Sequence, residues 1–276
     1  MISFSRSTGI NNYAGRKDNM KKNILDNFNL KGKMAVITGT TKGLGQSMAE
    51  ALAEAGANVV ALDRSDNPYL ANFCANLGVN FKRIRMDLMK DSEKDVESVI
   101  DSIIAEYTRI DILVNNAGIS RRGEVHEFNY DDWLDVMQVN LTAPFLLSRA
   151  VSRGFIIQRS GKIINMASML SFQGGIRVPS YSSSKHGIVG LTKSFAVALG
   201  PYGVNVNAIA PGFMDTDLTL PLQQDTKRNA SILQRIPTGR WGRGEDLKGI
   251  LIFLSSSMSD YINGAIIPVD GGWLTT

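Results

Sequence analysis

Short apolar runs alternate with longer segments of helical periodicity along most of the chain. The apolar runs, which are typical of β-strands, are Met34–Thr38, Asn58–Asp63, Asn80–Met86, Ile110–Val114, Lys162–Met166, Val204–Ile209 and Ala265–Val269. The helical segments between them are Gly43–Ala55, Pro68–Leu77, Ser92–Tyr107, Tyr130–Arg153, Tyr181–Gly200 and Glu245–Ser256. Several runs are apolar without alternation, as expected of strands that are covered on both faces. The pattern predicts an α/β fold, a doubly wound parallel sheet of about seven strands with helices on both faces.

No linker, internal repeat or low-complexity block interrupts residues 23–276, and we expect them to form a single domain. Residues 211–240 are the least regular part of that domain. A stretch of this length without strong periodicity is typical of an active-site lid or binding loop, so we predict a substrate lid here. Residues 1–22 are predicted to be a disordered basic extension, with the protein proper opening at Met20 and a transit peptide as the alternative.

The net charge of +4 comes from the first 22 residues, which hold five basic side chains and one acidic one. The rest of the chain has 25 basic and 25 acidic side chains, so its charge indicates no nucleic-acid partner. No apolar run approaches the ~18 residues of a membrane span. The sequence has one cysteine, Cys74, and two histidines, which excludes an intrachain disulfide and a His/Cys zinc site. We therefore expect a cytoplasmic protein with no bound metal and no membrane or nucleic-acid partner.

A glycine-rich turn joins the first predicted strand to the first predicted helix. Residues 39–45 read GTTKGLG, which allows a tight turn and a close approach of a diphosphate to the backbone. The N-terminus of the helix adds free N–H groups and the positive end of its dipole. Any tight β–α turn looks similar, but its place after the first strand favours a dinucleotide site. The residues expected to contact the dinucleotide here are Gly39, Thr41, Lys42, Gly43, Leu44 and Gly45.

The second predicted strand ends at Asp63, eighteen residues after Gly45. A carboxylate at this point accepts hydrogen bonds from both hydroxyls of an adenosine ribose and repels a 2′-phosphate, which favours NAD as the coenzyme. Arg64 follows directly and suits a 2′-phosphate, so NADP is the alternative. Further contacts are predicted where the third and fourth strands end at the same edge of the sheet, at Asp87, Leu88, Asn115, Ala117 and Gly118.

Tyr181 and Lys185 are four residues apart on a predicted helix and therefore share one face. A tyrosine with its reference pKa of about 10 is a poor base at neutral pH, but an ammonium one turn away favours the phenolate. Ser168 follows the fifth predicted strand, at the edge where ligands bind such sheets. Asn140 lies inside a predicted helix, where an amide is a mediocre helix former and suits a polar task. Taken singly, these residues have structural alternatives, such as a surface pair or a turn cap.

Together these motifs resemble the short-chain dehydrogenase/reductase family in order and spacing. The matching residues are Thr38-Gly39-x-x-x-Gly43-x-Gly45, Asn115-Asn116-Ala117-Gly118, Asn140, Ser168, Tyr181-x-x-x-Lys185 and Pro211-Gly212. The resemblance runs from Leu30 to the C-terminus and implies a Rossmann-type fold, hydride transfer on a nicotinamide coenzyme and a homotetramer. Thr40 stands where the family commonly has alanine, a departure that we expect to leave the chemistry untouched.

The resemblance also implies a role for each of four catalytic residues. Tyr181 is the general acid/base, and Lys185 lowers its pKa and binds the nicotinamide ribose. Ser168 orients the substrate oxygen, and Asn140 holds a water of the proton relay. The coenzyme contacts that the resemblance adds are Pro211, Gly212 and Thr216, besides Tyr181 and Lys185 themselves.

The substrate is predicted to be a keto or hydroxy sugar acid. The segments Gly161–Tyr181 and Arg235–Gly242 resemble those of family members that act on six-carbon sugar acids of uronate breakdown. Arginine can clamp a carboxylate, and the loop residue Arg177 is the first candidate, with Arg122 as the second. Gln173 is expected to bond a sugar hydroxyl. The alternatives are a gluconate 5-dehydrogenase-like activity, a 3-oxoacyl-carrier-protein reductase-like activity, and a catalytically silent coenzyme-binding protein.

Overall fold

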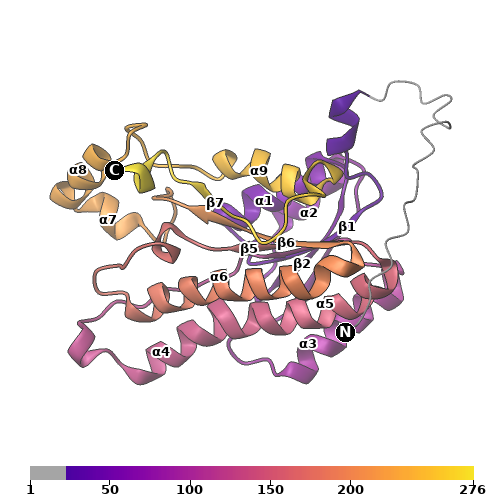
Figure 1. Cartoon of the computed structure of the whole chain (residues 1–276), viewed down its shortest axis with the longest axis horizontal. Coiled ribbons are helices and arrows are strands. Elements are labelled where there is room, and N and C mark those ends of the chain that lie inside the picture. Colours follow the sequence, from indigo (N-terminus) through magenta and orange to yellow (C-terminus); the bar gives the residue numbers. More distant parts are fainter. Residues whose placement is uncertain (1–22) are drawn as a thin grey trace, which may run out of the picture.

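The computed structural model describes residues 23–276, and the extension expected over residues 1–22 lies outside the described residues. Within them, seven strands form one sheet in the order β3-β2-β1-β4-β5-β6-β7, and every neighbouring pair is parallel (Figure 1). The strands are β1 (Met34–Thr38), β2 (Asn58–Asp63), β3 (Phe81–Arg85), β4 (Ile112–Asn115), β5 (Gly161–Met166), β6 (Val204–Pro211) and β7 (Ile266–Val269). The doubly wound sheet is confirmed: β1 and β2 have the predicted bounds, and the ends of the other strands differ from the predicted ones by at most two residues.

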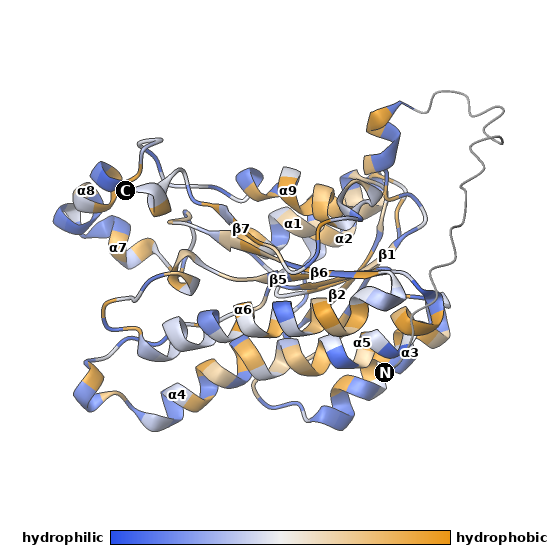
Figure 2. Cartoon of the chain, viewed as in Figure 1, coloured by the Kyte–Doolittle hydropathy of each residue, from blue (hydrophilic) through white to orange (hydrophobic). Residues whose placement is uncertain are grey.

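Helices cover both faces of the sheet (Figure 1). One layer consists of α1 (Gly43–Glu54), α2 (Pro68–Asn76) and α9 (Glu245–Ser255). The other consists of α3 (Glu93–Tyr107), α4 (Tyr130–Met137), α5 (Ala143–Gln158) and α6 (Pro179–Leu199). Hydrophobic residues gather on the strands and on the inner helix faces, and hydrophilic residues on the outer faces (Figure 2). No helix within residues 23–276 is long and apolar enough to cross a membrane.

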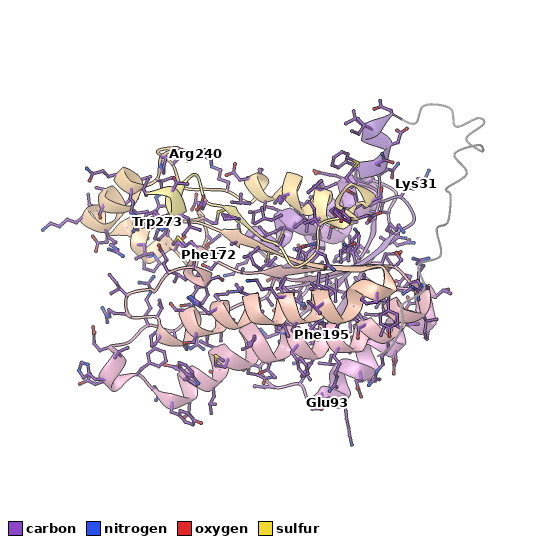
Figure 3. All side chains as sticks on the ribbon, viewed as in Figure 1. Lys31, Glu93, Phe172, Phe195, Arg240 and Trp273 are labelled. Carbon is purple, nitrogen blue, oxygen red and sulfur yellow. The ribbon has the colours of Figure 1, made fainter. Side chains whose placement is uncertain are left out.

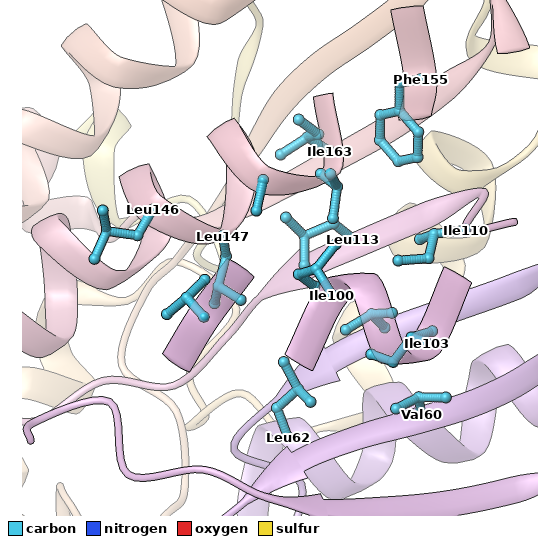
Figure 4. Packing of buried hydrophobic residues seen from close by; sticks show 14 of the residues in the cluster. Val60, Leu62, Ile100, Ile103, Ile110, Leu113, Leu146, Leu147, Phe155 and Ile163 are labelled. Atoms are coloured by element: carbon cyan, nitrogen blue, oxygen red, sulfur yellow. The ribbon is translucent and has the colours of Figure 1, made fainter. Parts of the chain in front are cut away.

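The core between the sheet and α3 and α5 shows how the strands are held (Figure 4). Ile103, Leu113, Leu147 and Phe155 are completely buried there. Each such side chain contributes about 1.5–3 kcal/mol of transfer free energy. At the start of β5, a Cβ on Gly161 would lie 2.3 Å from the Phe155 ring, so the absence of a side chain lets the ring pack against the strand.

The single helix expected over Tyr130–Arg153 is divided by a π-helical turn at Gln138–Thr142, between α4 and α5. The N–H of Ala143 donates to the carbonyl of Gln138, five residues back, in place of the usual four. Such turns occur frequently at functional sites. The extra residue shifts the register between the two helices, and Asn140 lies in the middle of the turn.

The irregular segment at residues 211–240 contains two short helices, α7 (Leu220–Gln224) and α8 (Thr226–Arg235). The sequence pattern missed them because α8 buries only Ile232 and α7 buries no residue. An aromatic cluster anchors the base of this segment: the Phe213 ring lies 5.4 Å from the Trp241 ring and 4.7 Å from the Trp273 ring. Trp273, near the C-terminus, lies beside these helices (Figure 3).

Candidate active site

A cavity of about 590 Å³ opens where β1, β2, β3 and β4 end. The order of the strands reverses between β1 and β4, and doubly wound sheets bind their ligands at this point. Most of the predicted coenzyme contacts line it: Gly39, Thr41, Lys42, Gly43, Leu44, Gly45, Asp63, Asp87, Leu88, Ala117, Gly118 and Thr216. Asn116, which belongs to the Asn115–Gly118 motif, lines the cavity although it was not predicted as a contact. The other unpredicted lining residues carry no distinctive motif: Leu62, Ser65, Met86, Met89, Ile119, Val139, Asp215, Asp217, Leu218 and Leu220.

Two glycines of the glycine-rich turn are required by the backbone itself. Gly39 has a φ of +74°, and a Cβ there would lie 3.0 Å from the Cα of Ala117. A Cβ on Gly45 would lie 1.9 Å from the carbonyl oxygen of Gly39, so only glycine lets α1 begin this close to β1. Within residues 23–276, no side chain caps the first turn of α1, whose N-cap residue is Lys42. Its N–H groups therefore remain available at the cavity, and the turn fits the diphosphate of a dinucleotide.

Asn116 and Thr38 tie together the loops that follow β1 and β4. The side-chain amide of Asn116 donates to the carbonyls of Thr38 and Gly39, both at 2.9 Å. The hydroxyl of Thr38 accepts from the N–H groups of Asn116 at 3.0 Å and Ala117 at 2.9 Å. Thr38 ends β1 and Asn116 directly follows β4, and polar residues at the ends of two neighbouring strands are the sequence feature that indicates this link.

Asp63, the last residue of β2, is 5% exposed and lines the cavity. Its Oδ1 accepts from the N–H of Thr40 at 2.8 Å, and its Oδ2 accepts from the Thr40 hydroxyl at 2.5 Å. Burial raises the pKa of the Asp63 carboxyl, and the hydrogen bonds from Thr40 lower it. Thr40, which was expected to leave the chemistry untouched, thus holds the carboxylate that is predicted to select the coenzyme. Arg64 is exposed and lines the same cavity.

Five of the predicted coenzyme contacts do not line this cavity, namely Asn115, Pro211, Gly212, Tyr181 and Lys185. The side chain of Asn115 is buried and donates to the Ser148 hydroxyl at 3.0 Å and to the Asn165 amide oxygen at 2.8 Å. It therefore links β4 to α5 and β5 in the interior. Pro211 is the last residue of β6, and Gly212 packs against the chain beyond β7.

Tyr181 and Lys185 lie one turn apart on α6, as their spacing predicts. The Nζ of Lys185 lies 5.5 Å from the centre of the Tyr181 ring and donates to the carbonyl of Met166, at the end of β5, at 2.6 Å. Gly118 lies next to them at the edge of the cavity: a Cβ there would be 3.8 Å from the Lys185 Nζ and 3.4 Å from the Asn140 Oδ1. The catalytic candidates therefore border the cavity at its Gly118 end.

Ser168 is both a turn cap and a neighbour of the tyrosine. It follows β5, and its hydroxyl accepts from the N–H of Leu170 at 3.1 Å at the start of a short 3₁₀ turn. The same side chain hydrogen-bonds to that of Tyr181. The structural alternative of a turn cap is therefore present, and the catalytic role of Ser168 stays a prediction.

Asn140 is connected to the same helix through Ser184. Its Nδ2 donates to the Ser184 hydroxyl at 3.2 Å, and that hydroxyl donates to the carbonyl of Tyr181 at 2.8 Å. Four residues after Asn140 the chain has Pro144, which carries no N–H, so the backbone carbonyl of Asn140 lacks its α-helical donor. The missing donor for this carbonyl thus lies next to the π-helical turn in the sequence.

Burial determines the charge states of the catalytic pair. It raises the pKa of Tyr181 above its usual value, and the hydrogen bond with Ser168 opposes this shift. It lowers the pKa of Lys185 to about 8. The neighbouring ammonium was expected to lower the pKa of Tyr181, whereas here burial raises it, because the phenolate is removed from water. At neutral pH Tyr181 therefore carries its proton, and Lys185 is still mainly an ammonium.

The predicted substrate arginines lie on two adjoining loops, since the N–H of Gly123 donates to the carbonyl of Arg177 at 3.0 Å. Arg177 has a φ of +63°, and its Nε pairs with the Glu124 carboxylate at 3.0 Å. Arg122 is exposed and forms no ion pair within residues 23–276. Gln173 is half-buried in the loop between Ser168 and α6. The structure thus commits Arg177 to an acidic neighbour and leaves Arg122 available.

The segment after β6 contacts the glycine-rich turn. Lys42 pairs with Asp217 at 2.5 Å, and both side chains are largely exposed at the mouth of the cavity. The methyl group of Thr216 would lie 3.8 Å from a Cβ on Gly43. The first residues of the segment that was predicted to be a lid therefore lie against the phosphate end of the cavity.

A glycine-rich turn at a helix N-terminus, beside a half-buried tyrosine and a buried lysine with a serine and an asparagine, defines a dinucleotide-dependent oxidoreductase. The profile of the short chain dehydrogenase family matches residues 33–227. The chain belongs to the short-chain dehydrogenase/reductase family, and it is an NAD(P)-dependent enzyme that acts on CH–OH groups.

Several known proteins are similar over nearly the whole chain. The 2-dehydro-3-deoxy-D-gluconate 5-dehydrogenase of Escherichia coli is 49% identical over 91% of this chain and 99% of its own length. A crystal structure of an Agrobacterium tumefaciens protein with bound NADP is 46% identical, with a TM-score of 0.84, and covers 91% of this chain and 100% of its own. The gluconate 5-dehydrogenase of Burkholderia cenocepacia, in complex with NADP and tartrate, is 38% identical, with a TM-score of 0.87, over 91% and 99% of the two chains.

Proposed function

We propose that the protein transfers a hydride between NAD and a keto or hydroxy sugar acid, with 2-dehydro-3-deoxy-D-gluconate and its oxidised 5-keto partner as the substrate pair. The observation that carries this proposal is the Tyr181–Lys185 pair beside Ser168, at the end of a dinucleotide-sized cavity. The names of the relatives supply the substrate class, since the 49% identical protein acts on this sugar acid.

Each member of the site has a separate task in this reaction. When bound, the nicotinamide coenzyme would supply or accept the hydride of the reaction. In reduction, the Tyr181 hydroxyl gives its proton to the substrate oxygen, and in oxidation the Tyr181 oxygen takes the hydroxyl proton. The Ser168 hydroxyl holds the same substrate oxygen beside Tyr181. The ammonium of Lys185 binds the nicotinamide ribose and stabilises the phenolate that remains after reduction.

The raised pKa of Tyr181 gives the two directions different pH requirements. Reduction needs the protonated phenol, which is the form present at neutral pH. Oxidation needs the phenolate, so it is favoured as the pH rises. Asn140 contributes to the proton relay through its backbone carbonyl. Because Pro144 has no N–H to donate to it, this carbonyl is suited to accept a hydrogen bond from a water of the relay.

NAD is proposed as the coenzyme because of Asp63. A buried carboxylate at the end of β2 accepts from ribose hydroxyls and repels a 2′-phosphate. Two similar structures contain NADP, and the exposed Arg64 offers a cation for its extra phosphate. In this chain, however, Asp63 is fixed at the cavity by two hydrogen bonds, whereas Arg64 is exposed on the loop that follows.

A carboxylate of the substrate is proposed to bind at the loop of Arg122. Arg177, the first candidate from the sequence, already has the Glu124 carboxylate as its partner. The Glu124 carboxylate already occupies the Nε side of Arg177 and partly neutralises its charge, whereas Arg122 has its five N–H donors available. Gln173 stays the candidate for a sugar hydroxyl. Residues 211–240 are proposed to act as the lid over this substrate, and a cytoplasmic location is part of the proposal.

The experiment that tests the function is a coenzyme-linked assay with three substrate classes: keto sugar acids, neutral ketoses and 3-oxoacyl thioesters. We expect oxidation of NADH with keto sugar acids and at least ~10-fold lower kcat/KM for the other two classes, because only the acid fills the arginine loop. A preference for thioesters or neutral ketoses would refute the sugar-acid proposal, and no turnover with any class would refute the catalytic one. Gluconate as the better oxidation substrate would support the 5-dehydrogenase alternative.

A further inference from the structure

The carboxylate of Asp63 is held at both oxygens by one residue. The N–H of Thr40 donates to Oδ1 at 2.8 Å, and the hydroxyl of Thr40 donates to Oδ2 at 2.5 Å. Asp63 is 5% exposed and Thr40 is completely buried, so water does not compete for these bonds. Within residues 23–276, Asp63 forms no ion pair, and Thr40 is therefore its principal partner. The contact joins the end of β2 to the first residue after Gly39.

Thr40 is itself fixed from a third element. The side-chain amide of Asn67 donates to the carbonyl of Thr40 at 3.0 Å, and the Asn67 Oδ1 accepts from the N–H of Leu70 at 3.0 Å as the N-cap of α2. Asn67 is buried as well. A chain of hydrogen bonds thus runs from the start of α2 through Thr40 to Asp63, and it sets the direction in which the carboxylate faces the cavity.

We propose that Thr40 is a positioning residue that sets the coenzyme preference by holding the Asp63 carboxylate aimed at the ribose site. This inference rests on the proposed function, in which Asp63 selects NAD. An ionised carboxylate has about four acceptor positions. Thr40 occupies one on each oxygen, which leaves one on each oxygen for the two hydroxyls of an adenosine ribose.

The charge of Asp63 depends on the same two bonds, with smaller influences from the N–H of Gly39 and the charge of Arg83. Burial raises the pKa of the carboxyl, and the hydroxyl and N–H of Thr40 are the largest opposing influences. Without the hydroxyl, protonation extends to higher pH. A protonated Asp63 no longer repels a 2′-phosphate and loses acceptor positions for the ribose. The alcohol of Thr40 therefore contributes to discrimination between NAD and NADP, although its own contacts are with Asp63.

The test uses Thr40→Val, which keeps the shape of the side chain and removes the hydroxyl, and Thr40→Ser, which keeps the hydroxyl. The dissociation constants of NADH and NADPH are measured by energy transfer from tryptophan to the nicotinamide, which requires no substrate. We expect Thr40→Val to weaken NADH binding about 10-fold, as for loss of a hydrogen bond to a charged group, and to weaken NADPH binding little or not at all. Thr40→Ser is expected to stay within about threefold of the wild type.

Two further measurements separate positioning from a merely structural role. The NADH preference of Thr40→Val should decline more steeply than that of the wild type as the pH falls from 8 to 5. In an Asp63→Asn background, Thr40→Val should leave the preference unchanged, because the charge through which it acts is gone. Equal weakening of both coenzymes by Thr40→Val, or a full effect in the Asp63→Asn background, would overturn the inference. If the wild type prefers NADPH, the proposal of NAD as the coenzyme is refuted. The inference about Thr40 is tested separately, because it predicts that Thr40→Val shifts the preference further toward NADPH in that case too.

Discussion

The side chain of Asn140 binds both backbone groups of Ile119. Its Oδ1 accepts from the Ile119 N–H at 2.9 Å, and its Nδ2 donates to the Ile119 carbonyl at 2.9 Å. Ile119 belongs to the loop after β4 that lines the cavity, and Asn140 belongs to the π-helical turn. The pair of bonds therefore fixes the catalytic end of the cavity to the helix layer, and Asn140 has a structural task in addition to its proposed place in the proton relay.

Asn140→Ala should lower the free energy of unfolding by about 2 kcal/mol, because both Ile119 groups lose their partner in a half-buried loop. Asn140→Asp keeps the acceptor for the Ile119 N–H but faces the Ile119 carbonyl with an oxygen, so it should be intermediate in stability. Urea unfolding measures both variants. A stability of Asn140→Ala equal to that of the wild type would show that these bonds contribute nothing.

Lys185→Met should stabilise the protein while abolishing its activity. The pKa of Lys185 is about 8 in the folded protein and 10.5 when unperturbed, so the unfolded chain binds more protons between these pH values. The buried ammonium then costs about 3 kcal/mol below pH 8, and this cost is relieved as the pH rises toward 10.5. The lost bond to the Met166 carbonyl offsets about 1 kcal/mol of the gain.

We therefore expect Lys185→Met to be about 2 kcal/mol more stable at pH 7, with a smaller difference at pH 9.5. Denaturant unfolding at the two pH values measures this. A Met variant that is less stable than the wild type at pH 7, or a difference that grows with pH, would contradict the assigned state of Lys185.

Arg122→Ala should reduce kcat/KM for sugar acids by about 10- to 150-fold, the range of a charge-assisted hydrogen bond of 1.5–3 kcal/mol. Arg122→Lys should recover only part, since an ammonium lacks the planar fork of the guanidinium. The matched control is Arg177→Ala, which removes an arginine already paired with Glu124 and should cost less. If Arg177→Ala lowers kcat/KM for charged substrates more than Arg122→Ala does, and leaves neutral substrates unaffected, then Arg177 binds the substrate carboxylate, as first predicted from the sequence.

The outer faces of α5 and α6 are expected to contact other subunits. Ile157 on α5 is 85% exposed and Val197 on α6 is 81% exposed, whereas solvent-facing helix positions are usually polar. Light scattering at micromolar concentration should give a mass of about 120 kDa, four times the chain mass of 30.1 kDa. A mass near that of one chain would refute the homotetramer.

The parts of the fold and site that the sequence predicts are those with local signals. Strands covered on both faces are continuous apolar runs, and the glycine-rich turn and the Tyr181–Lys185 spacing each lie within one short segment. The π-helical turn at Asn140 was missed because α4 and α5 share one helical periodicity across it. Contacts between distant residues leave no periodic trace, so the hold of Thr40 on Asp63 was missed as well.

Side-chain direction was the other source of difference. Asn115 stands in a motif at the edge of the cavity, yet its amide turns inward to Ser148 and Asn165. Arg177 was placed correctly on its loop, but a sequence does not show that the loop brings Glu124 within 3.0 Å of its Nε. Both outcomes depend on which neighbour satisfies a polar group, and this is decided by tertiary packing.

The most direct test of the account is turnover by Tyr181→Phe, with NADH and the 5-keto form of 2-dehydro-3-deoxy-D-gluconate as the substrates. The variant keeps the ring and its packing on α6 and removes only the hydroxyl group that carries the transferable proton. We predict that kcat falls by ~10² or more while the dissociation constant of NADH changes less than about threefold. A kcat within about threefold of the wild type would show that Tyr181 is not the general acid and would contradict the central claim.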